Sequence, residues 1–128
     1  MEYIENYLYT LLSHYHQYDD CRKALILHRV YISFEKTFEN FIRENSLRLP
    51  ERPGRFHKDL IDKICDYLNL SSDIHIILDD LRRFRHVFAN NYSVIHFDEE
   101  RLDSIYALIE NNFEELIAIV KEVDHVRD

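Results

Sequence analysis

One segment, residues 81–92 with the sequence LRRFRHVFANNY, carries side chains that are unusual for a helical face. Arg85 lies seven residues after Leu78, so on a helix it projects from the apolar face and not from the solvated one. A guanidinium in that position needs an anionic partner. Periodicity alone favours a buried ion pair with a carboxylate such as Asp79 or Asp80, or with one on a neighbouring helix.

Basic side chains gather in two segments of an otherwise acidic chain. The formal net charge is −8, which counts against binding of a polyanion unless the basic residues are concentrated locally. They are concentrated in this way, in one group of Arg48, Arg52, Arg55 and Lys58 and in a second group of Arg82, Arg83, Arg85 and His86. A charged run is usually only a solvated face, so binding of RNA needs further support.

That support comes from a resemblance. The run RHVFANNY at residues 85–92 resembles the motif of HepT-like HEPN proteins, in which an arginine is followed by a polar residue, four residues separate the arginine from a histidine, and a tyrosine follows two positions later. The preceding LRRF and the earlier run RFHKDLI at residues 55–61 also look similar to that group. The resemblance extends from about Arg22 to the last predicted helix.

The resemblance implies a toxin that cleaves RNA without a metal ion, with tRNA as one candidate substrate. It also implies a homodimer and a minimal nucleotidyltransferase as the antitoxin. In such a mechanism the RNA 2′-hydroxyl attacks the adjacent phosphate, the arginine holds that phosphate, and the histidine moves protons. By position, the arginine is Arg85 and the histidine position is Asn90, while Tyr92 matches the tyrosine to which the antitoxin attaches AMP. The expected RNA contacts are Arg82, Arg83, His86, Arg55 and Lys58.

The chain departs from the family pattern at Asn90. An amide cannot take up and release a proton near pH 7 as imidazole does, and loss of such help typically costs on the order of 10²–10⁴ in rate. We therefore expect an impaired ribonuclease. His86 is the nearest substitute proton carrier, although its position is a variable polar one in the motif, and His57 is a weaker candidate on the basic loop.

Two other interpretations remain open. The chain is alternatively a non-catalytic HEPN-like module that binds a nucleotidyltransferase or a nucleotide, and Asn90 favours this reading. It is alternatively a structural helical dimer in which Arg85 and Tyr92 pair internally.

The elements that hold these residues are expected to be helices. One glycine and two prolines in 128 residues are typical of long helices and argue against an all-β or a glycine-rich nucleotide-binding fold. Apolar spacings of three and four residues predict a first helix from Met1 to about His16 and a long central helix through Leu27 and Phe41, with Tyr31, Phe34 and Phe38 on its core stripe.

The same pattern continues through the second half of the chain. Residues 49–54, LPERPG, hold both prolines and the only glycine and therefore form a loop. A short third helix is predicted from Phe56 to Asn69. A fourth starts near residues 71–73 and ends near Asn90, and Asp98 begins a last helix that runs almost to the C-terminus.

These elements predict an all-α fold, an antiparallel bundle of four or five helices in one domain spanning residues 1–128. Arg85 and Asn90 differ by about 140° around an ideal helix. A cleft containing both is therefore best completed by a second copy, which agrees with the homodimer that the resemblance implies.

Composition limits location and chemistry. The chain contains no long apolar run and its first residues are acidic, so we expect no membrane insertion and no export, and a cytoplasmic protein. Cys21 and Cys65 lack metal-binding spacing and are expected to be reduced and structural. The eight histidines form no metal-ligand pattern, and we expect no metal and no cofactor.

Overall fold

The computed structural model describes residues 2–91 and 99–125, with side chains described for residues 4–85 and 99–123. All regular structure in these ranges is helical, as predicted. The elements are α1 (Glu2–His14), the 3-10 turn η1 (Tyr15–Gln17), α2 (Asp20–Glu44), α3 (Phe56–Tyr67), α4 (Ser72–Asn91), α5 (Glu99–Asn111) and α6 (Phe113–His125).

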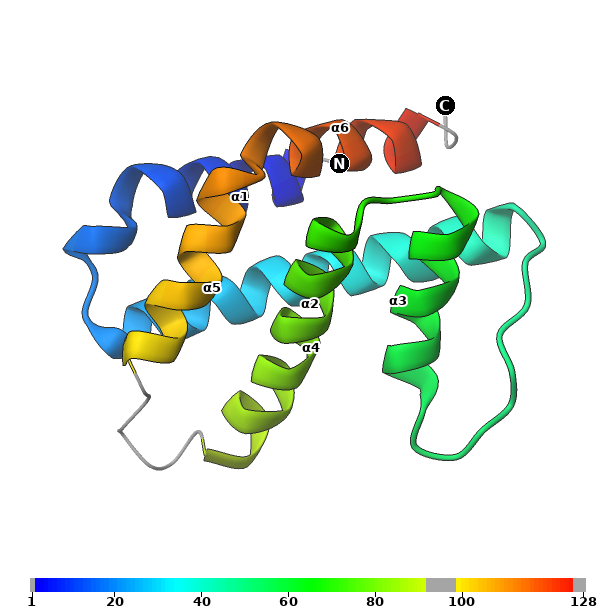
Figure 1. Cartoon of the computed structure of the whole chain (residues 1–128), viewed down its shortest axis with the longest axis horizontal. Coiled ribbons are helices and arrows are strands. Elements are labelled where there is room, and N and C mark those ends of the chain that lie inside the picture. Colours follow the sequence, from blue (N-terminus) through cyan, green and yellow to red (C-terminus); the bar gives the residue numbers. More distant parts are fainter. Residues whose placement is uncertain (1, 92–98, 126–128) are drawn as a thin grey trace.

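The helix α2 is the centre of the fold and contacts each of the other five α-helices (Figure 1). Its predicted stripe is core, because Leu27, Tyr31, Phe34, Phe38 and Phe41 are all at most 2% exposed. The other helices pack against these five large side chains, so α2 determines where the surrounding elements lie.

Both ends of α2 are set by local hydrogen bonds. The Asp19 carboxylate accepts a bond from the Arg22 amide at 2.9 Å and caps the first turn. At the other end Ser46 has φ +54°, and the Leu47 amide donates to the Ile42 carbonyl at 3.0 Å, which closes the helix. The chain then enters the predicted loop, where Gly54 supplies a φ of +74° that other residues rarely adopt.

The helices α3 and α4 form an antiparallel pair against α2 (Figure 1). The end of α3 resembles that of α2, with Asn69 at φ +54° and a bond from the Leu70 amide to the Cys65 carbonyl at 2.9 Å. Ser71 begins α4 as predicted, since its hydroxyl accepts a long bond from the Ile74 amide at 3.4 Å. The start of α3 therefore lies beside the second half of α4.

The expectation of one continuous last helix was wrong, and with it the count of four or five helices. Six α-helices are present in the described ranges because the last segment divides at Asn112 into α5 and α6 (Figure 1). The Asn112 side-chain amide donates to the Leu108 carbonyl at 2.9 Å and so competes with the helical backbone. The apolar spacing runs through the bend, and for this reason it did not reveal the division.

Smaller differences concern helix ends and the cysteines. The first helix ends at His14, before the 3-10 turn, and α3 ends two residues earlier than predicted, at Tyr67. Cys65 is buried, as expected of a structural residue, whereas Cys21 is exposed. In the described ranges, no helix combines the length and the apolar character needed to cross a bilayer.

Candidate functional site

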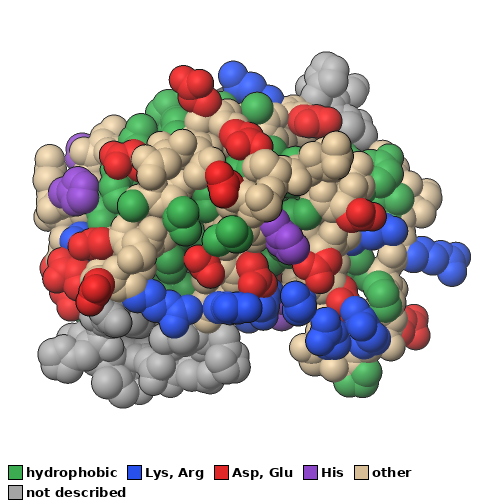
Figure 2. All heavy atoms as spheres, in the orientation of Figure 1, with side chains coloured by type: hydrophobic (Ala, Val, Ile, Leu, Met, Phe, Trp, Pro, Cys, Tyr) green, Lys and Arg blue, Asp and Glu red, His purple; other side chains and the backbone are tan. Residues whose placement is uncertain are grey.

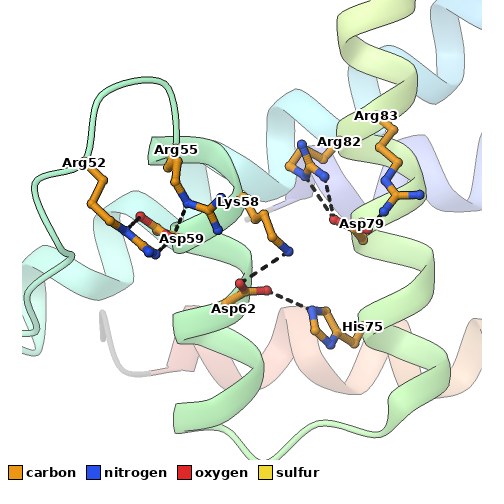
Figure 3. A network of polar contacts seen from close by, with 9 residues as sticks. All are labelled: Arg52, Arg55, Lys58, Asp59, Asp62, His75, Asp79, Arg82 and Arg83. Carbon is orange, nitrogen blue, oxygen red and sulfur yellow. Dashed lines mark hydrogen bonds and ion pairs between the residues drawn. The ribbon is translucent and has the colours of Figure 1, made fainter.

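The two predicted groups of basic residues come together on the antiparallel pair α3 and α4. Figure 3 shows Arg55 and Lys58, at the start of α3, on the same side of the molecule as Arg82 and Arg83 of α4. In Figure 2, Lys and Arg side chains line the lower edge of the molecule, although the chain as a whole is acidic. The fold therefore concentrates positive charge on one edge, which a net charge of −8 does not predict.

On α4, the two basic side chains Arg82 and Arg83 share one carboxylate partner, Asp79. The Arg82 guanidinium donates to the Asp79 carboxylate at 2.9 and 3.0 Å, and Arg83 approaches the other Asp79 oxygen at 3.1 Å (Figure 3). Ion pairs one turn apart on a helix contribute modest stability, and this one is partly buried, since the Arg82 and Asp79 side chains are 23% and 19% exposed.

On α3, two further carboxylates play the same role. Arg52 and Arg55 both reach Asp59, and Lys58 lies 3.6 Å from Asp62 (Figure 3). Asp59 itself is buried, so the pairing also holds the loop before α3 against the helix.

Arg85 differs from these basic residues. Its side chain is half-buried, on the helical face that also carries the buried Leu78 and Leu81. Its Nε atom is buried and has no hydrogen-bond partner among the described residues. Of the partners that periodicity allowed, Asp79 binds Arg82 and Arg83 instead. A buried donor without a partner is costly, which points to a ligand and not to stability as its purpose.

A buried carboxylate lies on the neighbouring part of α2. Glu35 is 9% exposed and its Oε2 atom accepts a hydrogen bond from the Tyr31 hydroxyl at 2.6 Å. The Nδ1 atom of His57, from the first turn of α3, lies 2.6 Å from the same oxygen. His57 thus lies in the first turn of α3, directly after the basic loop and within the range predicted for the third helix.

The charges of Glu35 and Arg85 act in opposite directions on the pKa values of two α2 side chains, His28 and Tyr31. Burial lowers the pKa of His28, the Arg85 charge lowers it further, and Glu35 opposes both effects. Burial and the hydrogen bond to Glu35 raise the pKa of Tyr31, while the charges of Arg85 and Arg82 act in the opposite direction. The described part of the site is therefore a corner where α2, α3 and α4 meet.

Sequence reasoning missed Glu35 and Tyr31 as members of this corner. The two side chains lie one helical turn apart on α2, and the described contact with His57 spans 22 positions in the sequence. The only signal was a glutamate beside the aromatic stripe, and a glutamate on a helix is usually solvated.

The structure describes only the backbone of two further predicted site residues, His86 and Asn90, and does not describe the third, Tyr92. His86 and Asn90 belong to α4, so the five-residue step from Arg85 to Asn90 is helical, but their side chains lie outside the described residues. Tyr92 lies outside the described residues altogether. Elsewhere in the described part of the chain, no group of three or more His, Cys, Asp and Glu residues is arranged to hold a metal ion.

Comparison with known proteins places the chain in a family. No curated protein and no solved structure matches it. One family model, described as HepT-like protein, matches residues 23–126. The matched region runs from the first turns of α2 to the end of the described chain and includes every residue of the corner. Together with the arginine-centred motif on α4, this match over most of the chain shows that the protein belongs to the HepT-like family.

Proposed function

We propose that this protein is the toxin of a HEPN toxin-antitoxin pair and that it cleaves RNA without a metal ion. Family membership implies a function related to HEPN toxins. The observation that carries the proposal is the half-buried Arg85, whose buried Nε has no hydrogen-bond partner among the described residues and which follows Arg82 by one turn of α4. Its fork of donors matches the oxygens of a phosphate.

In the proposed reaction, Arg85 binds the phosphate at the cleaved bond and stabilises the charge that develops as the ribose 2′-hydroxyl attacks. Arg82, Arg83, Arg55 and Lys58 bind flanking phosphates, whose contribution should depend on salt. His86, which follows Arg85 on α4, is proposed to bind a flanking phosphate as well.

Asn90 occupies the position of the proton-transferring histidine and makes the enzyme slow. Its amide can still orient the phosphate or the 2′-hydroxyl by hydrogen bonds.

The active form is proposed to be a homodimer. Pairing two copies along the basic edge would bring both Arg85 residues to one groove and double its positive charge. The partner that controls the toxin is a minimal nucleotidyltransferase, which attaches AMP to Tyr92. The added phosphate would compete with RNA for the same arginines, because it carries the same charge and acceptor oxygens.

Cleavage of tRNA and of a short RNA in the presence of EDTA tests the nuclease. Asn90→His should raise the rate, and Arg85→Ala should abolish cleavage in either background. Arg43→Ala is the matched control, because Arg43 is an exposed arginine in the last turn of α2, outside the corner. If Asn90→His leaves RNA intact and Arg85→Ala behaves like Arg43→Ala, the protein is not a ribonuclease.

The second candidate is a binding module that does not cut RNA, and Asn90 is the observation that favours it. Incubation with ATP and a nucleotidyltransferase encoded beside the gene separates the regulatory claims. Intact mass should show AMP on the wild type and none on Tyr92→Phe. An adduct on a different tyrosine, or undiminished RNA binding after full modification, would contradict the role of Tyr92.

A further inference from the structure

Glu35 and His57 form a pair whose geometry resembles that of carboxylate and histidine pairs in catalysis. The Glu35 carboxylate is buried on α2 and is held by the Tyr31 hydroxyl at 2.6 Å. Its Oε2 atom lies 2.6 Å from His57 Nδ1 on α3. A carboxylate that is itself fixed in this way fixes the imidazole ring and stabilises the imidazolium when a proton arrives.

The pair also determines which ring nitrogen can react. An ionised carboxylate only accepts hydrogen bonds, so Nδ1 of His57 carries the hydrogen and Nε2 has the lone pair. The His57 side chain is 39% exposed, so a ligand can reach the ring. The base is thus accessible while the group that orients it is buried.

The location of the pair fits the phosphate site. Tyr31, which binds Glu35, is acted on electrostatically by Arg85 and Arg82. His57 begins α3 between Arg55 and Lys58 of the basic edge. Because α3 and α4 pack as an antiparallel pair, a phosphate held by Arg85 in the second half of α4 would lie near the end of α3 that carries His57.

We propose that His57 is the proton-transfer residue of this site and that Glu35 and Tyr31 are positioning residues that act through it. The inference rests on the proposed ribonuclease function and deepens it. It explains how a chain with Asn90 at the histidine position would still cleave RNA.

The proposed step is balanced as follows. His57 Nε2 takes the proton of the 2′-hydroxyl, the 2′-oxygen forms a bond to phosphorus, and the bond from phosphorus to the 5′-oxygen breaks. The 5′-oxygen takes a proton from water, and the imidazolium returns its proton to solvent. The products are a 2′,3′-cyclic phosphate and a 5′-hydroxyl, and no metal or redox partner takes part.

A second histidine offers a matched control within the same pair of helices. His75 of α4 also contacts a carboxylate, Asp62 of α3, at 3.0 Å, and its side chain is 44% exposed (Figure 3). It precedes Arg85 by ten residues, which is about 15 Å along a helix. His57 and His75 thus have similar exposure and each contacts a carboxylate, but His75 does so through Nε2 and lies in the first half of α4, far along the helix from Arg85.

Several other charged groups surround His57 and bear on its pH dependence. From α2 these are Glu35, Tyr31 and His28, from α4 they are Arg82 and Arg85, and from α3 and the preceding loop they are Arg52, Arg55, Lys58 and Asp59. Of His57 and these side chains, two are imidazoles, His57 and His28, the group that ordinarily changes charge between pH 5 and 8.

The test measures cleavage of a short RNA in EDTA from pH 5 to 8.5 for the wild type, Arg85→Ala, His57→Gln, His75→Gln and Glu35→Gln. The wild-type rate should rise with pH over the range in which an imidazole loses its proton. His57→Gln should lower the rate on the order of 10²–10⁴-fold and abolish that rise, while His75→Gln should leave both unchanged. Glu35→Gln should lower the rate but, unlike His57→Gln, keep its rise with pH, because the imidazole is still present and is only less well oriented.

The outcomes separate the two proposals. If Arg85→Ala abolishes cleavage but His57→Gln matches His75→Gln, the role of His57 is wrong and the ribonuclease stands. If the wild type does not cleave, or Arg85→Ala has no effect, the role of His57 is wrong. The ribonuclease proposal is wrong as well only if Asn90→His also leaves RNA intact.

A measurement on the wild type covers the case in which His57→Gln does not fold. Addition of a nucleoside 3′-monophosphate should shift the NMR signal of the His57 ring and not that of His75. Equal or absent shifts would overturn the assignment.

Discussion

Replacing Arg85 with methionine should make the protein more stable and remove its activity. Methionine keeps an unbranched apolar stem of similar length and deletes the guanidinium, whose buried Nε has no hydrogen-bond partner among the described residues. An unsatisfied buried donor costs about 1–3 kcal/mol. The Arg85 side chain is half-buried, so the low end applies and we expect a gain of about 1 kcal/mol. For a domain of this size, the gain corresponds to about 3–5 °C in Tm.

The comparison variant is Arg82→Met, one turn earlier on α4. Its guanidinium is paired with Asp79 at 2.9 and 3.0 Å, so deletion should lower stability by about 0.5 kcal/mol. Urea unfolding followed by circular dichroism at 222 nm measures both variants. All proteins should be compared at one chain concentration, because assembly would make stability depend on concentration.

A ligand provides the second half of this prediction. A phosphate-bearing RNA fragment at ten times its Kd should stabilise the wild type by about 1.4 kcal/mol and leave Arg85→Met unchanged. The reasoning would be refuted if Arg85→Met were less stable than Arg82→Met, or if the fragment stabilised the wild type and Arg85→Met equally. Either result would mean that Arg85 serves the fold and not a ligand.

Lys23→Met should lower the free energy of unfolding at pH 7 by about 1–2 kcal/mol, because the buried ammonium binds two half-exposed carboxylates of α5. Hydrogen bonding from Tyr15, together with Lys23, holds the pKa of Asp103 below its usual range. The stabilisation that ionised Asp103 provides is complete above the pKa of Asp103 in the unfolded chain, which is about 4, and it is lost as the pH falls through the lowered pKa of the folded state. In urea unfolding at pH 2, the free energies of unfolding of the wild type and Lys23→Met should therefore differ less than at pH 7. Burial raises the pKa of the Cys65 thiol to about 12, so a thiol reagent at pH 8 should label Cys21 in the folded protein and Cys65 only after unfolding. Light scattering at tens of micromolar should give twice the chain mass of 15.7 kDa, and the mass of one chain would contradict the dimer.

Much of the fold could be predicted because helices are encoded locally. The stripe from Leu27 to Phe41 is core because its members recur every three or four residues, which is the period of a helix. The loop at residues 49–54 follows from proline and glycine, which break helices wherever they stand. The division at Asn112 escaped prediction because one side-chain bond to a carbonyl bends the chain without interrupting the apolar period.

The chemistry of the site divides in a similar way. Arg85 was predicted to leave the solvated face, since its spacing from Leu78 requires this, and its side chain is half-buried. Its partner was left open among Asp79, Asp80 and a carboxylate of a neighbouring helix, and Asp79 is instead occupied by Arg82 and Arg83 from one turn away. Local spacing shows which side chains can meet, but not which of several arginines occupies one carboxylate.

Local order along the chain was enough to determine the all-α class, most of the helices, the motif from Arg85 to Tyr92 and the family that the motif indicates, but not the division at Asn112. Only the tertiary structure decided that the start of α3 lies beside the second half of α4 and that Glu35 receives His57 across 22 positions. The physical reason is that apolar periodicity is satisfied within one helix, whereas burial of a carboxylate depends on which helices pack around it and on the donors they bring.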